Sequence, residues 1–214
     1  MKTPVTRLRL RNHLTYSWWK YLLLVIIAVF GWNIIYTVTR YRAPEEKKIV
    51  VNVYTYGDQN PLDAYMADVN ANLLPEMEEM YCIYSSPDDT YGDMVYSAHL
   101  AAAEGDIHIL TRDYFQRYAS TGAYIALEDD EELMAMLEAA GVSVSQGWRV
   151  DTETGERHLF GIPCANLPGI SEFLYSPADC YLSVLYRNGN DDNVFLFLHT
   201  FIADMLREPG DGAE

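Results

Sequence analysis

The sequence predicts an α/β fold, a single lobe with a mostly parallel sheet, behind one N-terminal transmembrane helix. Three observations carry this prediction. An apolar stretch near the N-terminus is long enough to span a bilayer. All 31 acidic residues follow residue 42, which separates a basic leader from an acidic domain. Beyond that point, short β-branched runs alternate with segments of helical periodicity.

Composition argues against several classes of protein. Half of the 214 residues are hydrophobic, which is too many for a disordered chain. The net charge of −16 is opposite to the basic face of a nucleic-acid-binding protein, so no nucleic acid is expected. Three cysteines do not make a disulfide-dense scaffold. A chain of this length can bury one adequate core and carry a small appendage.

The apolar stretch runs from Trp18 to Val38, and Lys20 is its one charged residue. As a helix, these residues would span about 31 Å, the thickness of a bilayer core. The short basic leader predicts an uncleaved signal-anchor over 18–39, with the N-terminus in the cytoplasm and the rest outside. Two alternatives stay open. One is a cleaved signal peptide with its core at Tyr21–Phe30, and the other is a buried helix of a soluble protein.

Each element of the lobe has its own signal. Strands are expected where β-branched and apolar residues run together, at 49–54, 80–84, 106–110, 124–127, 158–162 and 181–186. Helix starts are expected at Asn60 with Pro61, Asp88 or Asp89, Thr111, and Asp129 or Asp130. The second helix is expected to turn inward Tyr91, Met94, Val95, Ala98 and Ala102. The closing helix is expected to turn inward Val194, Phe197, Leu198, Phe201, Met205 and Leu206.

These signals divide the chain into five parts. They are a cytoplasmic tail (1–17), a transmembrane helix (18–39), a polar stalk (40–48), an extracytoplasmic α/β lobe (49–207) and a frayed tail (208–214).

Several short motifs in the lobe resemble the first lobe of a known family. They are the aromatic-Gly-polar loop at 54–58, the segment Glu104–Leu110, the segment Tyr118–Asp129 and the Phe-Gly-Ile-Pro run at 160–163. Together they resemble the extracellular solute-binding proteins of ABC importers, which have the type II periplasmic-binding fold. The resemblance implies a periplasmic-binding-protein-like lobe, an ABC transporter permease as partner, and a carbohydrate or other small polar solute as ligand.

The chain departs from that family in two ways. The family inserts a whole second lobe after the Gly-Ile-Pro run, whereas 51 residues follow Pro163 here. The family's usual anchor is a lipid on cysteine, whereas a helix is predicted here. The resemblance therefore covers a truncated, membrane-anchored first lobe.

Ligands of open parallel sheets meet the loops at the carboxyl ends of the strands. In those loops, Tyr56, Tyr91 and Trp148 are expected to stack on a sugar ring. Asp58, Arg112 and Asp113 are expected to bond polar groups of the ligand. The alternative is that these aromatic rings are ordinary packing and these charges are helix caps or solvated loop residues.

Metal, cofactor and enzyme signatures are missing from the sequence. The acidic clusters lack the spacing of a calcium loop, the histidines are unpaired, and no nucleophile or nucleotide motif follows a strand. We expect no cofactor, no metal and no enzymatic activity. Cys164 and Cys180 either close a 17-residue loop as a disulfide or stay reduced with Cys82, which is expected to be buried in a strand.

Two functions follow from these expectations. The first is a membrane-anchored, solute-binding-like accessory or degenerate component of an ABC-type importer, acting on carbohydrate or a similar solute. The alternative is a non-catalytic module that docks a membrane or envelope protein without binding solute. The oligomeric state is left open. A cleft at the strand ends favours the first function, and an apolar patch favours the second.

Overall fold

The computed structural model describes residues 7–87, 91–185 and 189–207. The chain forms two compact units, Met1–Arg42 and Ala43–Glu214. The expected caps Asp88 and Asp89, the strand end at Tyr186 and the tail at 208–214 lie outside the described residues.

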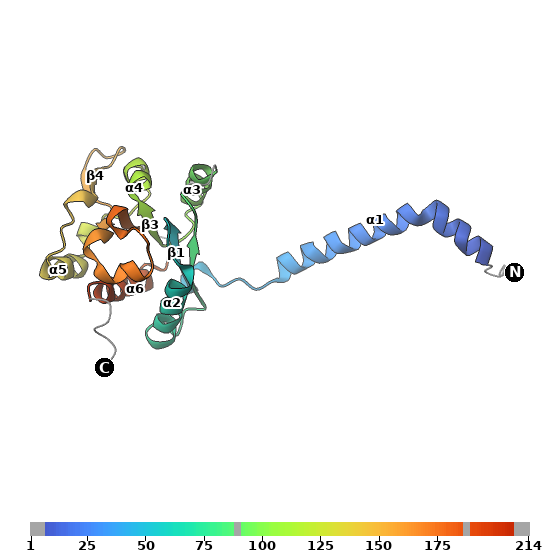
Figure 1. Ribbon diagram of the computed structural model, residues 1–214, viewed down its shortest axis with the longest axis horizontal. Helices are drawn as coiled ribbons and strands as arrows, with labels where there is room; N and C mark the ends of the chain where they lie inside the picture. The colour runs from blue at the N-terminus through green and yellow to red at the C-terminus, as the bar shows by residue number, and fades with distance from the viewer. Residues whose placement is uncertain (1–6, 88–90, 186–188, 208–214) are drawn as a thin grey trace. The chain divides into compact units, whose positions relative to one another are not determined.

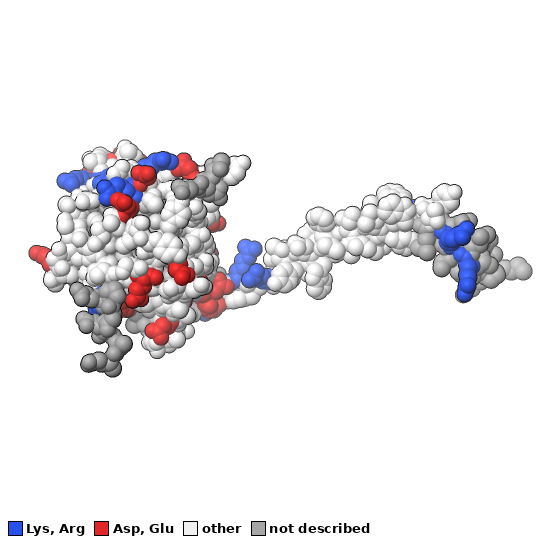
Figure 2. Space-filling view, viewed as in Figure 1, with Lys and Arg blue, Asp and Glu red and all other residues white. Residues whose placement is uncertain are grey.

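The described part of the first unit contains one long helix, α1 (Arg7–Thr39). Within it, the segment Thr15–Thr39 contains an 18-residue window with a mean hydropathy of 2.2, and none of that window is buried. On the face shown in Figure 2, basic side chains mark the two ends of the helix and the surface between them carries no charge. By length and composition, this helix can cross a membrane as a span or serve as a signal sequence.

The second unit alternates strands and helices (Figure 1). Its strands are β1 (Lys48–Tyr54), β2 (Glu79–Tyr84), β3 (Ile107–Thr111), β4 (Trp148–Val150), β5 (Arg157–Leu159), β6 (Ile162–Pro163) and β7 (Cys180–Val184). Its α-helices are α2 (Gln59–Asn72), α3 (Gly92–Ala101), α4 (Arg112–Tyr118), α5 (Glu131–Ala139) and α6 (Asp191–Met205). Short 3₁₀ helices are η1 (Glu45–Lys47), η2 (Leu127–Asp129), η3 (Ser145–Gly147), η4 (Cys164–Asn166), η5 (Pro168–Glu172) and η6 (Pro177–Asp179).

Five strands form the main sheet in the order β2-β1-β3-β7-β6, and β4 pairs with β5 in a separate hairpin. Strands β2, β1 and β3 are parallel, because each is followed by a helix that returns the chain to the same end. Strand β7 runs against β3 and against β6. Four of the five strands therefore point the same way, and the predicted α/β lobe with a mostly parallel sheet is confirmed.

Helices cover both faces of this sheet, which is why its strands are apolar on both sides. Helices α2, α5 and α6 pack on one face, and α3 and α4 on the other (Figure 1). The alternation along β7 separates the two cores, since Leu182 belongs to the first and Tyr181 to the second. The second core is rich in tyrosine and contains Tyr54, Tyr96, Tyr114, Tyr124 and Tyr181.

The predicted inward face of the second helix is wrong. In α3, Tyr91, Met94 and Val95 are exposed, and Ala98 and Ala102 are also exposed. The helix instead buries Tyr96, whose ring packs edge-on against Tyr54 at a centroid distance of 4.4 Å. Large aromatic rings bury more apolar area than alanine and methionine, so the tyrosine decides which face points inward.

Three smaller predictions also need correction. Residues 124–127 do not form a strand, because Tyr124 makes a single antiparallel bridge to Leu185 and η2 begins at Leu127. The run expected at 158–162 is two short strands, β5 and β6. Helix α2 begins at Gln59, and its N-cap is Asp58. Asn60, the expected start, therefore lies inside the first turn.

The remaining element predictions hold. Strands β1, β2, β3 and β7 start within one residue of their expected positions. Asp130 caps α5 by accepting a hydrogen bond from the Leu133 amide. Five of the six expected inward residues of α6 are buried, and Leu206 is partly buried against the same core.

Candidate functional site

The carboxyl ends of three parallel strands lie side by side at one edge of the sheet. Val53 of β1 pairs with Tyr84 of β2, and Tyr54 of β1 pairs with Leu110 of β3. The loops that follow these strands therefore meet at the same edge, which we call the carboxyl edge. Ligands of open α/β sheets bind at such an edge.

A segment of the chain itself covers this edge. Residues 164–179, which we call the crossover segment, connect β6 to β7 through η4, η5 and η6. The Asp58 amide donates to the Phe173 carbonyl at 3.0 Å, and the Tyr175 amide donates to the Tyr56 carbonyl at 3.0 Å. Gly57 and Leu174 form an antiparallel bridge between these two hydrogen bonds. The loop after β1 is thus paired like a strand with the crossover segment.

Side chains strengthen this closure. The Tyr84 hydroxyl donates to the Phe173 carbonyl at 3.2 Å, and an Arg112 nitrogen lies 2.8 Å from an Asp179 carboxylate oxygen. The backbone approaches so closely that a Cβ added to Gly57 would lie 2.2 Å from the Phe173 carbonyl oxygen. Glycine is the residue that permits this approach.

Five of the six predicted site residues lie at the carboxyl edge. Asp58 uses its Oδ1 atom to accept a hydrogen bond from the Asn60 amide at 3.1 Å, as the N-cap of α2. Arg112 is in the ion pair with Asp179, and Asp113 is exposed in the first turn of α4. Tyr56 and Tyr91 are 43% and 63% exposed, so their rings face solvent.

Trp148 is not part of this group. It begins β4 of the separate hairpin and packs against the first core, with the guanidinium of Arg157 5.6 Å from its ring centroid. Its partial burial under a cation is ordinary packing of an aromatic ring. Its role as a ligand-stacking residue is still a prediction, as are the roles of the other five.

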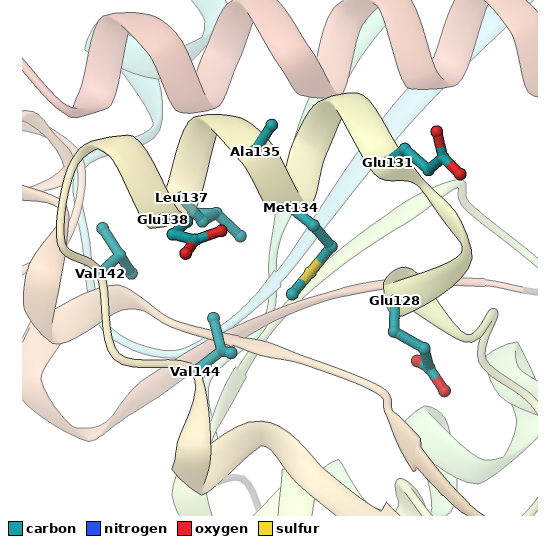
Figure 3. Close-up of a pocket in the computed structure, with 8 residues that line it drawn as sticks. All are labelled: Glu128, Glu131, Met134, Ala135, Leu137, Glu138, Val142 and Val144. Atoms are coloured by element: carbon teal, nitrogen blue, oxygen red, sulfur yellow. The ribbon is translucent and has the colours of Figure 1, made fainter.

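A pocket of about 500 Å³ lies elsewhere, beneath α5 (Figure 3). In the close-up, Met134 and Glu138 point from α5 toward Val142 and Val144 on the following loop, and Glu128 lies at the lower side. A second pocket of about 440 Å³, lined by Asp129, Asp130 and Phe195 among others, shares Glu131 with the first. Both are bordered by carboxylates around the start of α5, with apolar side chains inside.

Two histidine–carboxylate pairs hold the elements around these pockets. Glu128 accepts from the amide of Leu159 at 2.8 Å and lies 2.7 Å from Nδ1 of His158, and this hydrogen bond raises the pKa of His158. Nε2 of His199 lies 2.6 Å from Oδ2 of Asp130. The partners are 30 and 69 residues apart in sequence, so no local pattern reveals them. Because both carboxylates are already bonded, we assign these pairs a structural role.

Three polar side chains cross the middle of the sheet inside the second core. Asn52, His108 and Ser183 are direct cross-strand neighbours on β1, β3 and β7, and all three are buried. Nε2 of His108 lies 3.1 Å from the Glu104 carbonyl, whereas its Nδ1 makes no hydrogen bond to a described residue. Burial lowers the pKa of His108 to about 4, so the ring is neutral at pH 7.

Two observations on the described residues concern metal binding and thiol reactivity. Among the described residues, no three His, Cys, Asp or Glu side chains gather where they could hold a metal ion. Burial raises the pKa of the Cys82 thiol well above its usual range, with its hydrogen bond to Asp63 as a second cause, so it is a poor nucleophile. The arrangement at the carboxyl edge can contact a surface, but the Tyr56 carbonyl and the Asp58 amide are already paired with the crossover segment.

Comparison with known proteins gives a structural similarity that covers only part of the chain. No model of a known protein family matches the chain, and no curated protein matches it. Among solved structures, the chain is similar to an extracellular solute-binding protein family 1 from Alicyclobacillus acidocaldarius, with a TM-score of 0.40 and 17% identity. The similarity covers 57% of this chain and 29% of that protein, so the chain spans less than a third of its length. At this TM-score it assigns no family, and the α/β fold is established by the sheet itself.

Proposed function

We propose that the protein is a membrane-anchored, non-catalytic docking module whose α/β lobe lies outside the cytoplasm. One observation carries this proposal, namely the closure of the carboxyl edge by the crossover segment. A solute receptor needs a concave site with free polar groups. Here the backbone groups of Tyr56 and Asp58 that would meet a solute are bonded to Tyr175 and Phe173.

The outer surface of the closed edge suits a protein partner. Tyr56, Tyr91 and Tyr175 are 43%, 63% and 72% exposed, and Met94 is exposed one turn along α3 from Tyr91. Tyrosine is enriched in protein interfaces because it supplies a large rigid ring with a polar tip. These four residues define what we call the tyrosine surface.

The partner is a membrane protein in this proposal. The apolar helix α1 supports it, because a single span would hold the lobe near the bilayer, where membrane proteins are concentrated. Residues 43–214 carry 31 acidic and eight basic side chains, so the partner should present a basic or neutral surface. The permease of an ABC-type importer is the partner that the sequence resemblance implies.

A second function is an accessory solute-binding component of such an importer, with carbohydrate as the implied ligand. The exposure of Tyr56 and Tyr91 beside the Arg112–Asp179 ion pair favours it, because aromatic rings and charges together recognise sugars and other polar solutes. It would require the crossover segment to leave the edge, breaking the pairing of residues 56–58 with 173–175.

The test is site-specific photo-crosslinking of the full chain in the membranes of its source organism. A photoreactive phenylalanine analogue replaces Tyr91 or Tyr175, and the matched control places it at Glu138 on α5. We expect both tyrosine positions to give one product of the same mass, containing a membrane protein, that is reduced by Met94→Asp. No product from the tyrosine surface, or equal products from Glu138, would contradict the docking proposal.

A thermal-shift screen of the purified full chain in detergent separates the two functions. Sugars, oligosaccharides, amino acids and small peptides form the panel. A ligand at 100 times its Kd stabilises a folded protein by about 2.7 kcal/mol, a shift of several degrees in Tm. We expect no shift. A saturable shift that Tyr56→Ala abolishes would replace the docking proposal with solute binding.

A further inference from the structure

The crossover segment is bordered at both ends by cysteine. Cys164 is the first residue after β6, and Cys180 is the first residue of β7. Both are buried, at 0% and 1% exposure, and belong to the first core. A covalent bond between them would close the 17 residues that cover the carboxyl edge into a ring.

The register of the sheet places these two cysteines opposite each other. Strands β6 and β7 are antiparallel, with Ile162 opposite Leu182 and Pro163 opposite Tyr181. The next pair in this register would be Cys164 and Cys180, at the point where β6 ends and Cys164 begins η4. Directly opposed residues of an antiparallel pair have Cα atoms about 4.5–5.5 Å apart, and disulfides need about 4.4–6.8 Å.

Both side chains also point to the same face of the sheet. Successive side chains of a strand alternate between faces. Leu182 is in the first core and Tyr181 in the second, so Cys180 shares the face of Leu182. Cys164 begins η4 and is buried in the same core as Ile162, so all four side chains lie in the first core.

In the folded protein, the two thiols are enclosed by other protein groups. The Cys180 Sγ atom lies 3.2 Å from the Ser176 carbonyl and 3.4 Å from the Thr55 hydroxyl. Burial raises the pKa of the Cys164 thiol well above its usual range, and the neighbouring Cys180 raises it further. Thiols held in this way react slowly in the folded chain, so bond formation belongs to folding.

We propose that Cys164 and Cys180 form an intramolecular disulfide when the chain folds in the presence of a disulfide oxidant. One thiolate attacks the oxidant to give a mixed disulfide, and the second thiolate displaces the oxidant's remaining thiol. The two cysteines lose two electrons and two protons, and the oxidant is reduced to two thiols. The bond fixes both ends of the crossover segment, which keeps the carboxyl edge closed.

The test counts thiols and maps the bond in the purified full chain in detergent. The reduced protein is unfolded and refolded with oxidised glutathione, and thiols are then counted after denaturation. We expect one free thiol, and non-reducing peptide mass spectrometry should assign it to Cys82. Cys82→Ala is the matched control and should leave no free thiol while retaining the mapped bond.

Melting supplies a second readout that does not depend on mapping. Closing a ring of this size should raise the Tm by roughly 5–10 °C, so a reductant during refolding should lower it by that amount. The double variant Cys164→Ser/Cys180→Ser should be insensitive to the reductant, with circular dichroism checking that it folds. Three free thiols after oxidation, or a mapped bond involving Cys82, would overturn the proposal. Because the oxidant is supplied chemically, the result is independent of the docking function.

Discussion

At the scale of the residue, His108 is the group whose charge the fold tolerates least. It is fully buried, flanked on its neighbouring strands by Asn52 and Ser183 and surrounded by the rings of Tyr54, Tyr96 and Tyr124 at 5.7–6.1 Å. No described carboxylate forms an ion pair with it. The alternation of His108 with Ile107 and Ile109 in the sequence is typical of a core or lobe-face histidine. It gives no sign that Nδ1 bonds no described residue, because the cross-strand neighbours come from distant segments.

The buried ring predicts that acid destabilises the lobe. The pKa of His108 is about 4 in the folded chain and about 6.5 when unfolded, so the unfolded chain binds more protons between these values. The contribution of His108 to the free energy of unfolding should level off above about pH 6.5 and fall by up to about 3 kcal/mol as the pH drops to 4. Urea denaturation of the full chain at several pH values measures this fall.

A variant identifies the group responsible. His108→Leu should flatten the pH dependence between pH 6.5 and 4, even if its stability at pH 7 is reduced. His99→Gln changes a partly exposed neighbour that bonds Tyr54, and should keep the slope of the original chain. An unchanged slope in His108→Leu would show that other groups govern the acid response.

At the scale of the element, hydrophobic periodicity and helix-capping residues predict most of the fold. Strands β1, β2, β3 and β7 and the inward face of α6 were predictable because each has a long apolar or alternating run. Helix α3 was not, because its ten residues are apolar on several sides. Its orientation depends on Tyr96 meeting Tyr54 and Tyr114, which are far away in sequence. The crossover segment has no hydrophobic periodicity, so the sequence could not predict that it closes the carboxyl edge.

Two helix caps allow a quantitative prediction of the free energy of unfolding. Asp58 and Asp130 each accept an amide hydrogen bond at a helix start, but only Asp130 of the two also bonds a histidine, His199. Asp58→Ala should reduce the free energy of unfolding by about 1 kcal/mol. Asp130→Ala should cost about 2 kcal/mol or more, because it also removes the 2.6 Å contact with the partly buried His199, which then keeps only Glu132 at 3.7 Å.

Equilibrium unfolding without any added solute measures both effects. Asp113→Ala is the control, since Asp113 is exposed in the first turn of α4, and it should change stability by less than about 0.5 kcal/mol. An unchanged stability for Asp58→Ala would contradict its role as a cap. It would also return Asp58 to the solute-binding role that the sequence suggests.

At the scale of the whole molecule, charge segregation and the division into units coincide. The first unit ends at Arg42, and the acidic residues begin directly after it. The apolar helix and the acidic lobe need different surroundings. The helix must be shielded from water, whereas the net charge of the lobe keeps it in solution. The proposed function depends on this division, since the tyrosine surface is useful only if the helix holds the lobe at a membrane.

The proposed anchor, α1, makes the last prediction. Leu24 and Ile27 lie in the middle of the apolar segment Thr15–Thr39, and in a bilayer each arginine there would oppose insertion by about 3 kcal/mol. The full chain should stay in the membrane pellet through alkaline carbonate extraction, whereas Leu24→Arg/Ile27→Arg should be released. Thr15→Arg, at the edge of the span, should behave like the original chain. Intact mass of the membrane-bound protein should include Met1–Arg42. A shorter mass lacking the apolar helix would favour a cleaved signal peptide, and the lobe would then need its partner to stay at the membrane.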